Sequence, residues 1–133
     1  MAMRSLTLTA CLAALAVVGI GGTAFSADRN TGSNCFLSRD WEGWKSPSPN
    51  VIYLRVGVRQ IFEIDLSSGS NQLQEGDMHL IDKVRGSDWI CSPLDLDLQI
   101  ADDHGVYAEP LIVKSITRLT ADQVAAIPRK FLP

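Results

Sequence analysis

Two segments of this chain alternate apolar and polar residues with a period of two. In residues 60–66 (QIFEIDL), Phe62, Ile64 and Leu66 alternate with Glu63 and Asp65. In residues 94–100 (LDLDLQI), leucine and isoleucine alternate with aspartate and glutamine. Because successive side chains of a β-strand point to opposite faces, this period predicts strands with one buried and one solvated face. The alternation therefore favours a β-rich fold.

Further segments rich in β-branched, aromatic or other apolar residues predict additional strands at residues 51–56, 78–84, 89–91 and 111–116. Turns are expected around Gly57 and in residues 85–88 and 102–105, and residues 67–77 form a polar loop. Residues 35–50 end in a Pro-Ser-Pro turn. Thr120 is expected to cap a short helix over residues 121–127, which Pro128 ends. The expected fold class is mainly β (α+β), a small antiparallel sheet or partly open barrel of about six strands with one short C-terminal helix.

The first 26 residues have the layout of a secretory signal peptide. One charged residue, Arg4, precedes an apolar stretch at residues 8–20, and small residues lead to an expected cleavage site after Ser26. The apolar stretch is shorter than the roughly 20 residues of a membrane span, so no stable membrane insertion is expected once the signal is removed. A retained anchor and a lipidated Cys11 are the alternatives. Residues 27–34 would then be a flexible leader and residues 35–133 a single domain, periplasmic or secreted.

Charge excludes one class of partner. The chain has 12 Lys and Arg against 15 Asp and Glu, a formal charge of −3 with no basic stripe, which argues against electrostatic binding of nucleic acid. A hydrophobic content of 46% is too high for a disordered chain. We expect a folded domain with no nucleic-acid partner.

Removal of the signal peptide leaves two cysteines, Cys35 and Cys91. In an exported protein such a pair is typical of one disulfide. A catalytic thiol or two buried free thiols are the rival interpretations, but no neighbouring residue in the sequence resembles an activating base. We therefore predict a structural disulfide between Cys35 and Cys91.

Few side chains are candidates for a functional site. Trp41 and Trp44, in the sequence Trp-Glu-Gly-Trp, are a possible ligand surface for a sugar or peptide, although tryptophans in a small domain more often pack over the sheet. Asp102 and Asp103 beside His104 have the composition of a carboxylate-oriented base, yet a solvated turn explains them better.

Asp95 and Asp97, together with Asp102 and Asp103, are the densest acidic group and have oxygen ligands that calcium prefers. Their spacing does not match the calcium loop of helix-loop-helix proteins, and a strand face and a turn account for them. No cofactor and no metal site are predicted.

Several segments together resemble a family of small exported proteobacterial proteins known as a domain of unknown function. The resemblance rests on Cys-Phe at residues 35–36, on residues 61–66 (IFEIDL), 86–91 (GSDWIC) and 116–120 (ITRLT), and on their order. Members of that family usually carry four cysteines, and the two that are missing here correspond to Ser70 and Leu111. The resemblance implies that, if Cys35 pairs with Cys91, the missing two would be partners of each other. It implies no activity and no catalytic residue.

The function expected from the sequence is that of a non-catalytic binding or structural module of the bacterial envelope. Its partner would be an envelope protein or a small ligand, of a kind that the sequence leaves open. Two alternatives belong to other classes of protein. One is a small periplasmic hydrolase or metal-dependent enzyme that uses Asp102, Asp103 and His104, and the other is a redox protein that cycles Cys35 and Cys91.

Overall fold

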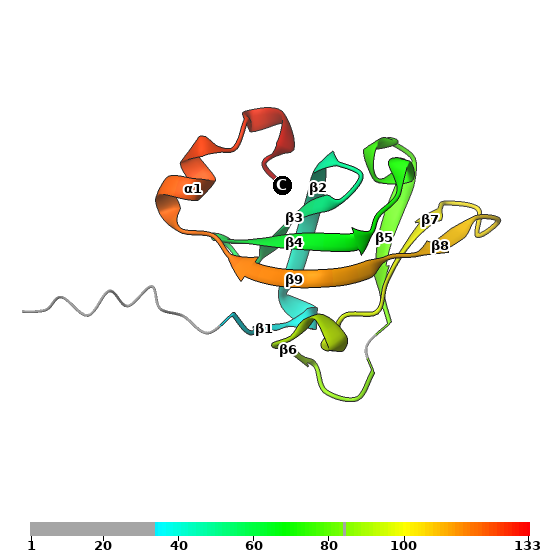
Figure 1. Ribbon diagram of the computed structural model, residues 1–133, viewed down its shortest axis with the longest axis horizontal. Helices are drawn as coiled ribbons and strands as arrows, with labels where there is room; N and C mark the ends of the chain where they lie inside the picture. Colours follow the sequence, from blue (N-terminus) through cyan, green and yellow to red (C-terminus); the bar gives the residue numbers. More distant parts are fainter. Residues whose placement is uncertain (1–33, 84) are drawn as a thin grey trace, which may run out of the picture.

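The computed structural model describes residues 34–83 and 85–133, which form nine strands in three antiparallel sheets with one short α-helix (Figure 1). The predicted mainly β fold is confirmed, and the described strands form no closed barrel. The four-stranded sheet has the order β2 (Trp41–Ser48), β3 (Val51–Val56), β4 (Gln60–Ser68), β9 (Ile112–Arg118). The three-stranded sheet has the order β5 (Met78–Asp82), β7 (Leu98–Asp102), β8 (Ala108–Pro110). The third sheet pairs β1 (Phe36–Leu37) with β6 (Trp89–Ile90).

Strands β3 and β4 form the hairpin that the period-two alternation predicts. Ile52, Leu54 and Val56 in β3 are buried and pair across the strands with the apolar positions of β4. The connection turns at Gly57, whose φ of 57° lies in the left-handed region that favours glycine. The polar residues of both strands face the opposite side of the sheet, as alternation requires.

The core gathers side chains from all three sheets. Phe36 of β1 packs against Phe62 of β4 with the ring centroids 4.8 Å apart. Ile90 of β6 and Ile100 of β7 are fully buried in the same cluster. The small sheet of β1 and β6 is therefore fastened to the larger sheets through the core as well as through its disulfide.

The C-terminal helix α1 (Ala121–Ala126) confirms the prediction of a Thr120 cap and ends one residue earlier than expected. The Thr120 side chain accepts the N–H of Gln123, and the Gln123 side chain accepts the N–H of Thr120, which is a capping box. Buried Ile127 anchors the chain after the helix. Figure 1 shows α1 and the C-terminal segment on one side of β4 and β9, with β1 and β6 on the other.

Four 3-10 turns complete the described residues. They are η1 (Ser38–Asp40), η2 (Asn71–Gln74), η3 (Pro93–Asp95) and η4 (Arg129–Phe131). Turn η2 lies inside the segment that the sequence indicates as a polar loop, and its Leu73 is buried in the core. The predicted signal peptide of residues 1–26 and the leader up to residue 33 lie outside the described residues.

The predicted strand over residues 94–100 is wrong in its first half. Leu94 lies in η3 and is 92% exposed, and the strand begins only at Leu98. The cause is local, because the Asp95 carboxylate accepts the N–H groups of Cys91 and Ser92 in a capping box. These bonds hold the backbone in a turn that competes with pairing.

Strands β1, β2 and β8 were not predicted. Pro47 lies inside β2, and a proline cannot donate to a strand ladder. The structure accommodates it because β2 is at the edge of its sheet and its pairing with β3 shifts register between Lys45 and Ser48. Strands β1 and β8 have two and three residues, too few to show a period.

Candidate ligand cleft between β2 and β5

Trp41 and Trp44 lie on the same face of β2. Residues three apart in a regular strand point to opposite faces, but the pairing of β2 with β3 shifts register between Trp41 and Gly43. Trp41 is consequently opposite Val56 and Trp44 opposite Leu54, both of which are buried. Both indoles are half-buried and pack against the core.

The two tryptophans form one wall of a cleft of about 490 Å³. Strand β5 contributes the facing side chains Leu80 and Asp82, which share a face because they are two residues apart. The volume falls within the range of roughly 300–1,000 Å³ that is usual for small-molecule sites. Trp41 and Trp44, which the sequence indicates as a ligand surface, thus lie together at a concave surface.

Asp82 is the most unusual polar group of the cleft. Its Oδ1 accepts the N–H of Asp97 at 3.3 Å, whereas its Oδ2 is buried and has no hydrogen-bond partner among the described residues. Burial, and secondarily the charge of Asp97, raise the pKa of the Asp82 carboxyl, although the Asp97 N–H opposes the shift. Asp97 is itself held by Arg85, with Nη2 at 2.6 Å and Nε at 2.8 Å from its Oδ2.

The charged side chains around the cleft are mostly acidic. Glu42, Asp82 and Asp88 face a single basic residue, Arg39. Among the described residues, the ion pairs are His79–Asp103 and Arg85–Asp97, so Arg39 pairs with no carboxylate there. The cleft therefore carries an excess of negative charge beside its aromatic wall.

Sequence reasoning found the tryptophans by residue type but missed Asp82, Leu80 and Arg39. Nothing local distinguishes Asp82 from any acidic residue at the end of a strand. Its environment depends on the N–H of Asp97, fifteen residues away, and on strand β2, which the sequence did not predict.

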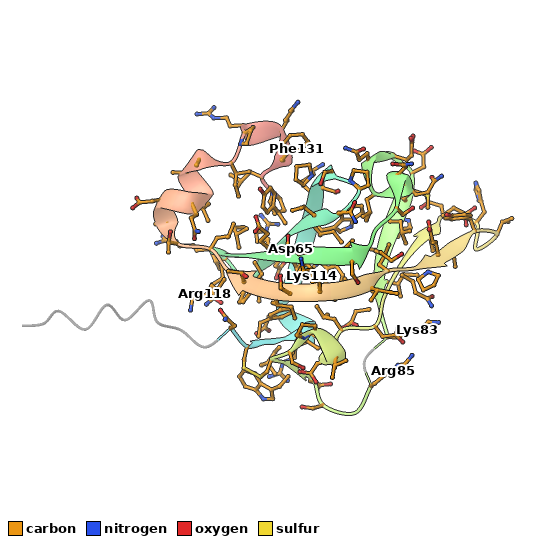
Figure 2. The ribbon with its side chains drawn as sticks, viewed as in Figure 1. Asp65, Lys83, Arg85, Lys114, Arg118 and Phe131 are labelled. Carbon is orange, nitrogen blue, oxygen red and sulfur yellow. A yellow bond between two sulfur atoms is a disulfide. The ribbon has the colours of Figure 1, made fainter. Side chains whose placement is uncertain are left out.

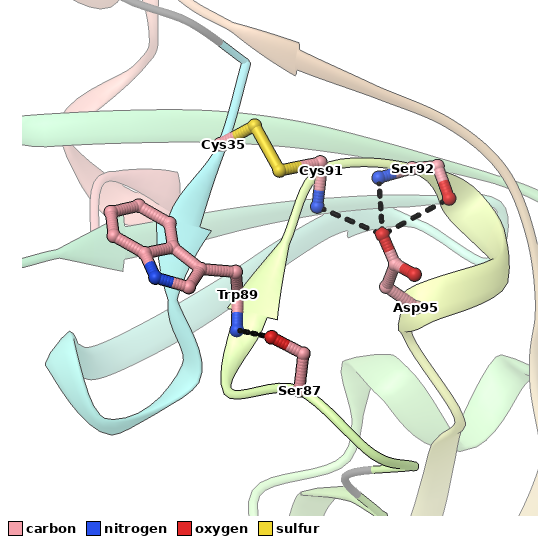
Figure 3. Close-up of a disulfide and its surroundings, with 6 residues drawn as sticks. All are labelled: Cys35, Ser87, Trp89, Cys91, Ser92 and Asp95. Atoms are coloured by element: carbon pink, nitrogen blue, oxygen red, sulfur yellow. Dashed lines mark hydrogen bonds between the residues drawn. A yellow bond between two sulfur atoms is a disulfide. The ribbon is translucent and has the colours of Figure 1, made fainter.

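Cys35 and Cys91 form a disulfide, as the sequence predicts. Phe36 pairs with Ile90, so the antiparallel register of β1 and β6 places the two cysteines opposite each other. Figure 3 shows the bridge beside η3, where the Asp95 carboxylate accepts the N–H groups of Cys91 and Ser92. Cys91 is exposed and Cys35 is half-buried.

A second cleft, of about 510 Å³, lies beside this disulfide and has a different electrostatic character. Trp89 lines it and is 53% exposed, so it packs less completely beside the bridge than the sequence indicates. Its charged residues are Arg59, Arg118 and Asp40, and Arg118 lies at the end of β9 (Figure 2). This tryptophan cleft is thus mainly basic.

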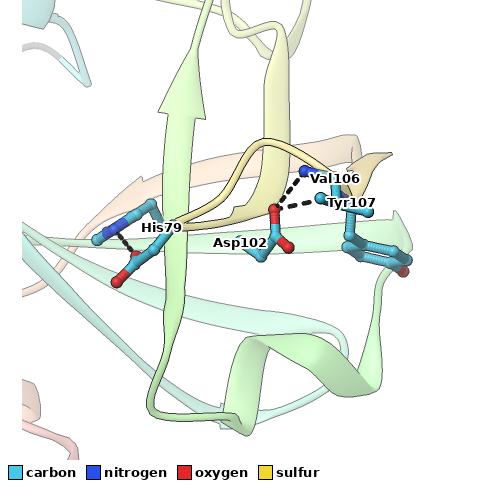
Figure 4. Close-up of polar contacts among 5 residues, drawn as sticks. His79, Asp102, Val106 and Tyr107 are labelled. Carbon is cyan, nitrogen blue, oxygen red and sulfur yellow. Dashed lines mark hydrogen bonds and ion pairs between the residues drawn. The ribbon is translucent and has the colours of Figure 1, made fainter.

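Asp102, Asp103 and His104 lie in the predicted turn but do not converge on one another. The Asp102 Oδ1 accepts the N–H groups of Val106 at 2.9 Å and Tyr107 at 3.1 Å (Figure 4). These bonds, above all that of Tyr107, lower the pKa of the Asp102 carboxyl. Asp103 pairs with His79, which sequence reasoning did not connect with it, because the pairing of β5 with β7 brings them together.

The acidic group shows no metal geometry. Asp95 caps η3 and Asp97 binds Arg85, so their carboxylates are directed at different partners. Among residues 34–83 and 85–133, no three His, Cys, Asp or Glu side chains gather in a way that could hold a metal ion. In the same part of the chain, no helix has the length and apolar character needed to cross a membrane.

Comparisons with protein-family models, with curated proteins and with solved structures find no match to this chain. The residues of the clefts are therefore the basis on which its function is inferred.

Proposed function

We propose that this chain is a small exported, non-catalytic binding module of the bacterial envelope that takes a small ligand in the cleft of Trp41 and Trp44. The observation that carries the proposal is the juxtaposition of two indoles with the Asp82 Oδ2, a buried acceptor that has no donor among the described residues. Buried polar atoms without partners are few in native proteins, and a ligand that supplies the missing hydrogen bond is one explanation.

The cleft has further properties of a binding site. Tryptophan offers a large apolar face together with one polar N–H, and this combination makes it common at ligand and protein interfaces. The register shift within β2 supports the same interpretation, because such irregularities often re-aim a side chain near a functional site.

Export is proposed from the signal-like sequence of residues 1–26 and is compatible with the disulfide. The intact mass of the protein recovered from the periplasm or the medium tests it. A chain that begins near Ala27, with two thiols labelled only after reduction, would support export. A full-length mass, or a lipid on Cys11, would contradict it.

Binding is tested by the indole N–H signals of the three tryptophans in a ¹⁵N-correlated NMR spectrum. Neutral sugars, amino acids and small amines are titrated one by one as probes. A binding module predicts saturable shifts of the Trp41 and Trp44 signals by at least one class of probe. Trp44→Leu should weaken these shifts, whereas Trp89→Phe, in the other cleft, should leave them unchanged. Absence of any saturable shift at Trp41 and Trp44 would contradict the proposal.

A further inference from the structure

The cleft of Trp41 and Trp44 has a net formal charge that selects between classes of ligand. Glu42, Asp82 and Asp88 contribute three negative charges and Arg39 one positive charge. A cleft lined by one sign of charge concentrates ligands of the opposite sign. Anionic ligands are therefore disfavoured here, and cationic ligands are favoured.

The aromatic wall favours the same class. The face of an indole carries negative charge density, and tryptophan is the best of the aromatic residues at attracting an ammonium group. Such contacts contribute more where water is excluded, and both Trp41 and Trp44 are half-buried.

The carboxylate of Asp82 narrows the choice to a cation that can donate a hydrogen bond. Its Oδ1 already accepts the N–H of Asp97, and its Oδ2 has no donor among the described residues. The nearby cation Arg85 is bonded to Asp97 instead. An ammonium group that retains N–H bonds could donate to Oδ2 and be charge-assisted in doing so, whereas a quaternary ammonium could not.

We infer that the ligand of this cleft is a protonated amine, whose N–H donates to Asp82 and whose apolar part lies against Trp41 and Trp44. This inference rests on the proposed function, because it names the ligand class of the same cleft. The second tryptophan cleft offers an internal contrast, since Arg59 and Arg118 outnumber Asp40 there. A protonated amine should therefore select the first cleft over the second within one molecule.

The experiment titrates the folded, disulfide-bonded protein with butylammonium, 1,5-diaminopentane and phenethylammonium, and follows the three indole N–H signals. Butanol is the neutral control of matched shape, tetramethylammonium is the cation without N–H bonds, and butyrate is the anion. We expect saturable shifts of Trp41 and Trp44 with at least one amine and none of Trp89. The amine should bind at least tenfold more tightly than butanol or tetramethylammonium, and butyrate should not bind.

Two variants assign the interaction to its residues. Asp82→Asn keeps the side-chain shape and the acceptor for Asp97 but removes the charge, so amine affinity should fall at least tenfold. Trp44→Leu keeps an apolar side chain without a π face and should weaken the amine severalfold. Asp40→Asn, in the second cleft, is the matched removal of an acidic charge and should leave amine affinity unchanged. The spectrum of each variant also reports whether the fold is retained.

The outcomes separate this inference from the proposed function. If neutral sugars or butanol shift Trp41 and Trp44 as well as the amines do, or if Asp82→Asn binds amines like the wild type, the cleft binds ligands but the amine assignment is wrong. If tetramethylammonium equals the primary amines, the hydrogen bond to Asp82 is wrong. If no probe of any class shifts these two signals, both proposals fail.

Discussion

The backbone of Gly69 lies directly against the carbonyl group of Pro49, leaving no room for a Cβ atom at that position. The Ser70 N–H donates to this same carbonyl at 3.0 Å, and the Leu66 N–H donates to the carbonyl of Asn50 at 2.8 Å. The turn between β2 and β3 is therefore fastened to the end of β4 by backbone contacts. These contacts also fix the end of β2, the strand that carries both tryptophans of the cleft.

Gly69→Ala should lower the free energy of unfolding by about 2–3 kcal/mol, because the added Cβ would overlap the Pro49 carbonyl and force the two backbones apart. Chemical denaturation of the purified protein measures this change. Gly76→Ala is the matched control, since a Cβ there meets no atom within 4 Å, and it should leave stability unchanged or slightly higher. Equal midpoints for the two variants would show that Gly69 is not tightly packed.

Replacement of both Cys35 and Cys91 by alanine should lower stability by about 4 kcal/mol, because the bridge restricts a long loop in the unfolded chain. Denaturation with and without a reductant should give the same difference for the wild type, and the reductant should not affect the double variant. A reduced wild-type protein with unchanged stability would contradict a structural role. It would instead favour the redox alternative, in which the exposed Cys91 is cycled with Cys35.

Local patterns in the sequence predicted part of this fold correctly and for identifiable reasons. Strands β3 and β4 were predictable because alternation reports a one-sided burial that the structure shows, and α1 because Thr120 makes its own capping box. The strand predicted at Leu94 was wrong because two leucines and two aspartates alternate there by coincidence, while Ser92 and Asp95 cap a turn.

The cleft could be predicted only in half. Trp41 and Trp44 stand out by residue type, but their common face depends on a register shift that no pattern of residues revealed. The carboxylate opposite them depends on how β5 lies relative to β2 and on the Asp97 N–H that occupies one of its oxygens. Such long-range relationships arise from packing, and a single sequence carries little signal for them.

Asp102→Ala should lower Tm near neutral pH, because the Val106 and Tyr107 N–H groups lose their acceptor. The lowered pKa of Asp102 sets the pH dependence: its stabilising effect is present above the ordinary value of 3.8 and is lost as pH falls through the depressed pKa. The Tm difference from wild type should therefore shrink in acid. His104→Ala, an exposed change in the same turn, is the control and should leave Tm unchanged. A larger effect of His104→Ala would contradict this account of the turn.

A double substitution, Ser70→Cys with Leu111→Cys, tests the proposed family relationship, which implies that these positions hold a second disulfide. Both side chains are buried, and Ser70 Oγ donates to Glu109, two residues before Leu111. We expect an intact mass two hydrogens lower than that of the reduced form and no free thiol under denaturing conditions. Either single cysteine variant should instead show one reactive thiol. Two free thiols in the double variant would count against the relationship.

Asp82→Asn should raise Tm near neutral pH, because it removes a partly buried charge while leaving an acceptor for the Asp97 N–H. The pKa of Asp82 is raised, so the folded protein holds this proton more tightly than the unfolded chain does. The carboxyl therefore destabilises the fold increasingly as pH rises from 3.8 through the raised pKa. The gain in Tm should accordingly diminish in acid, where wild-type Asp82 is protonated. Leu80→Asn, on the same face of the strand, is a contrasting change that should lower Tm, because Leu80 packs against the core. A lower Tm for Asp82→Asn would mean that Oδ2 already has a donor within the protein, which would leave no acceptor for an amine.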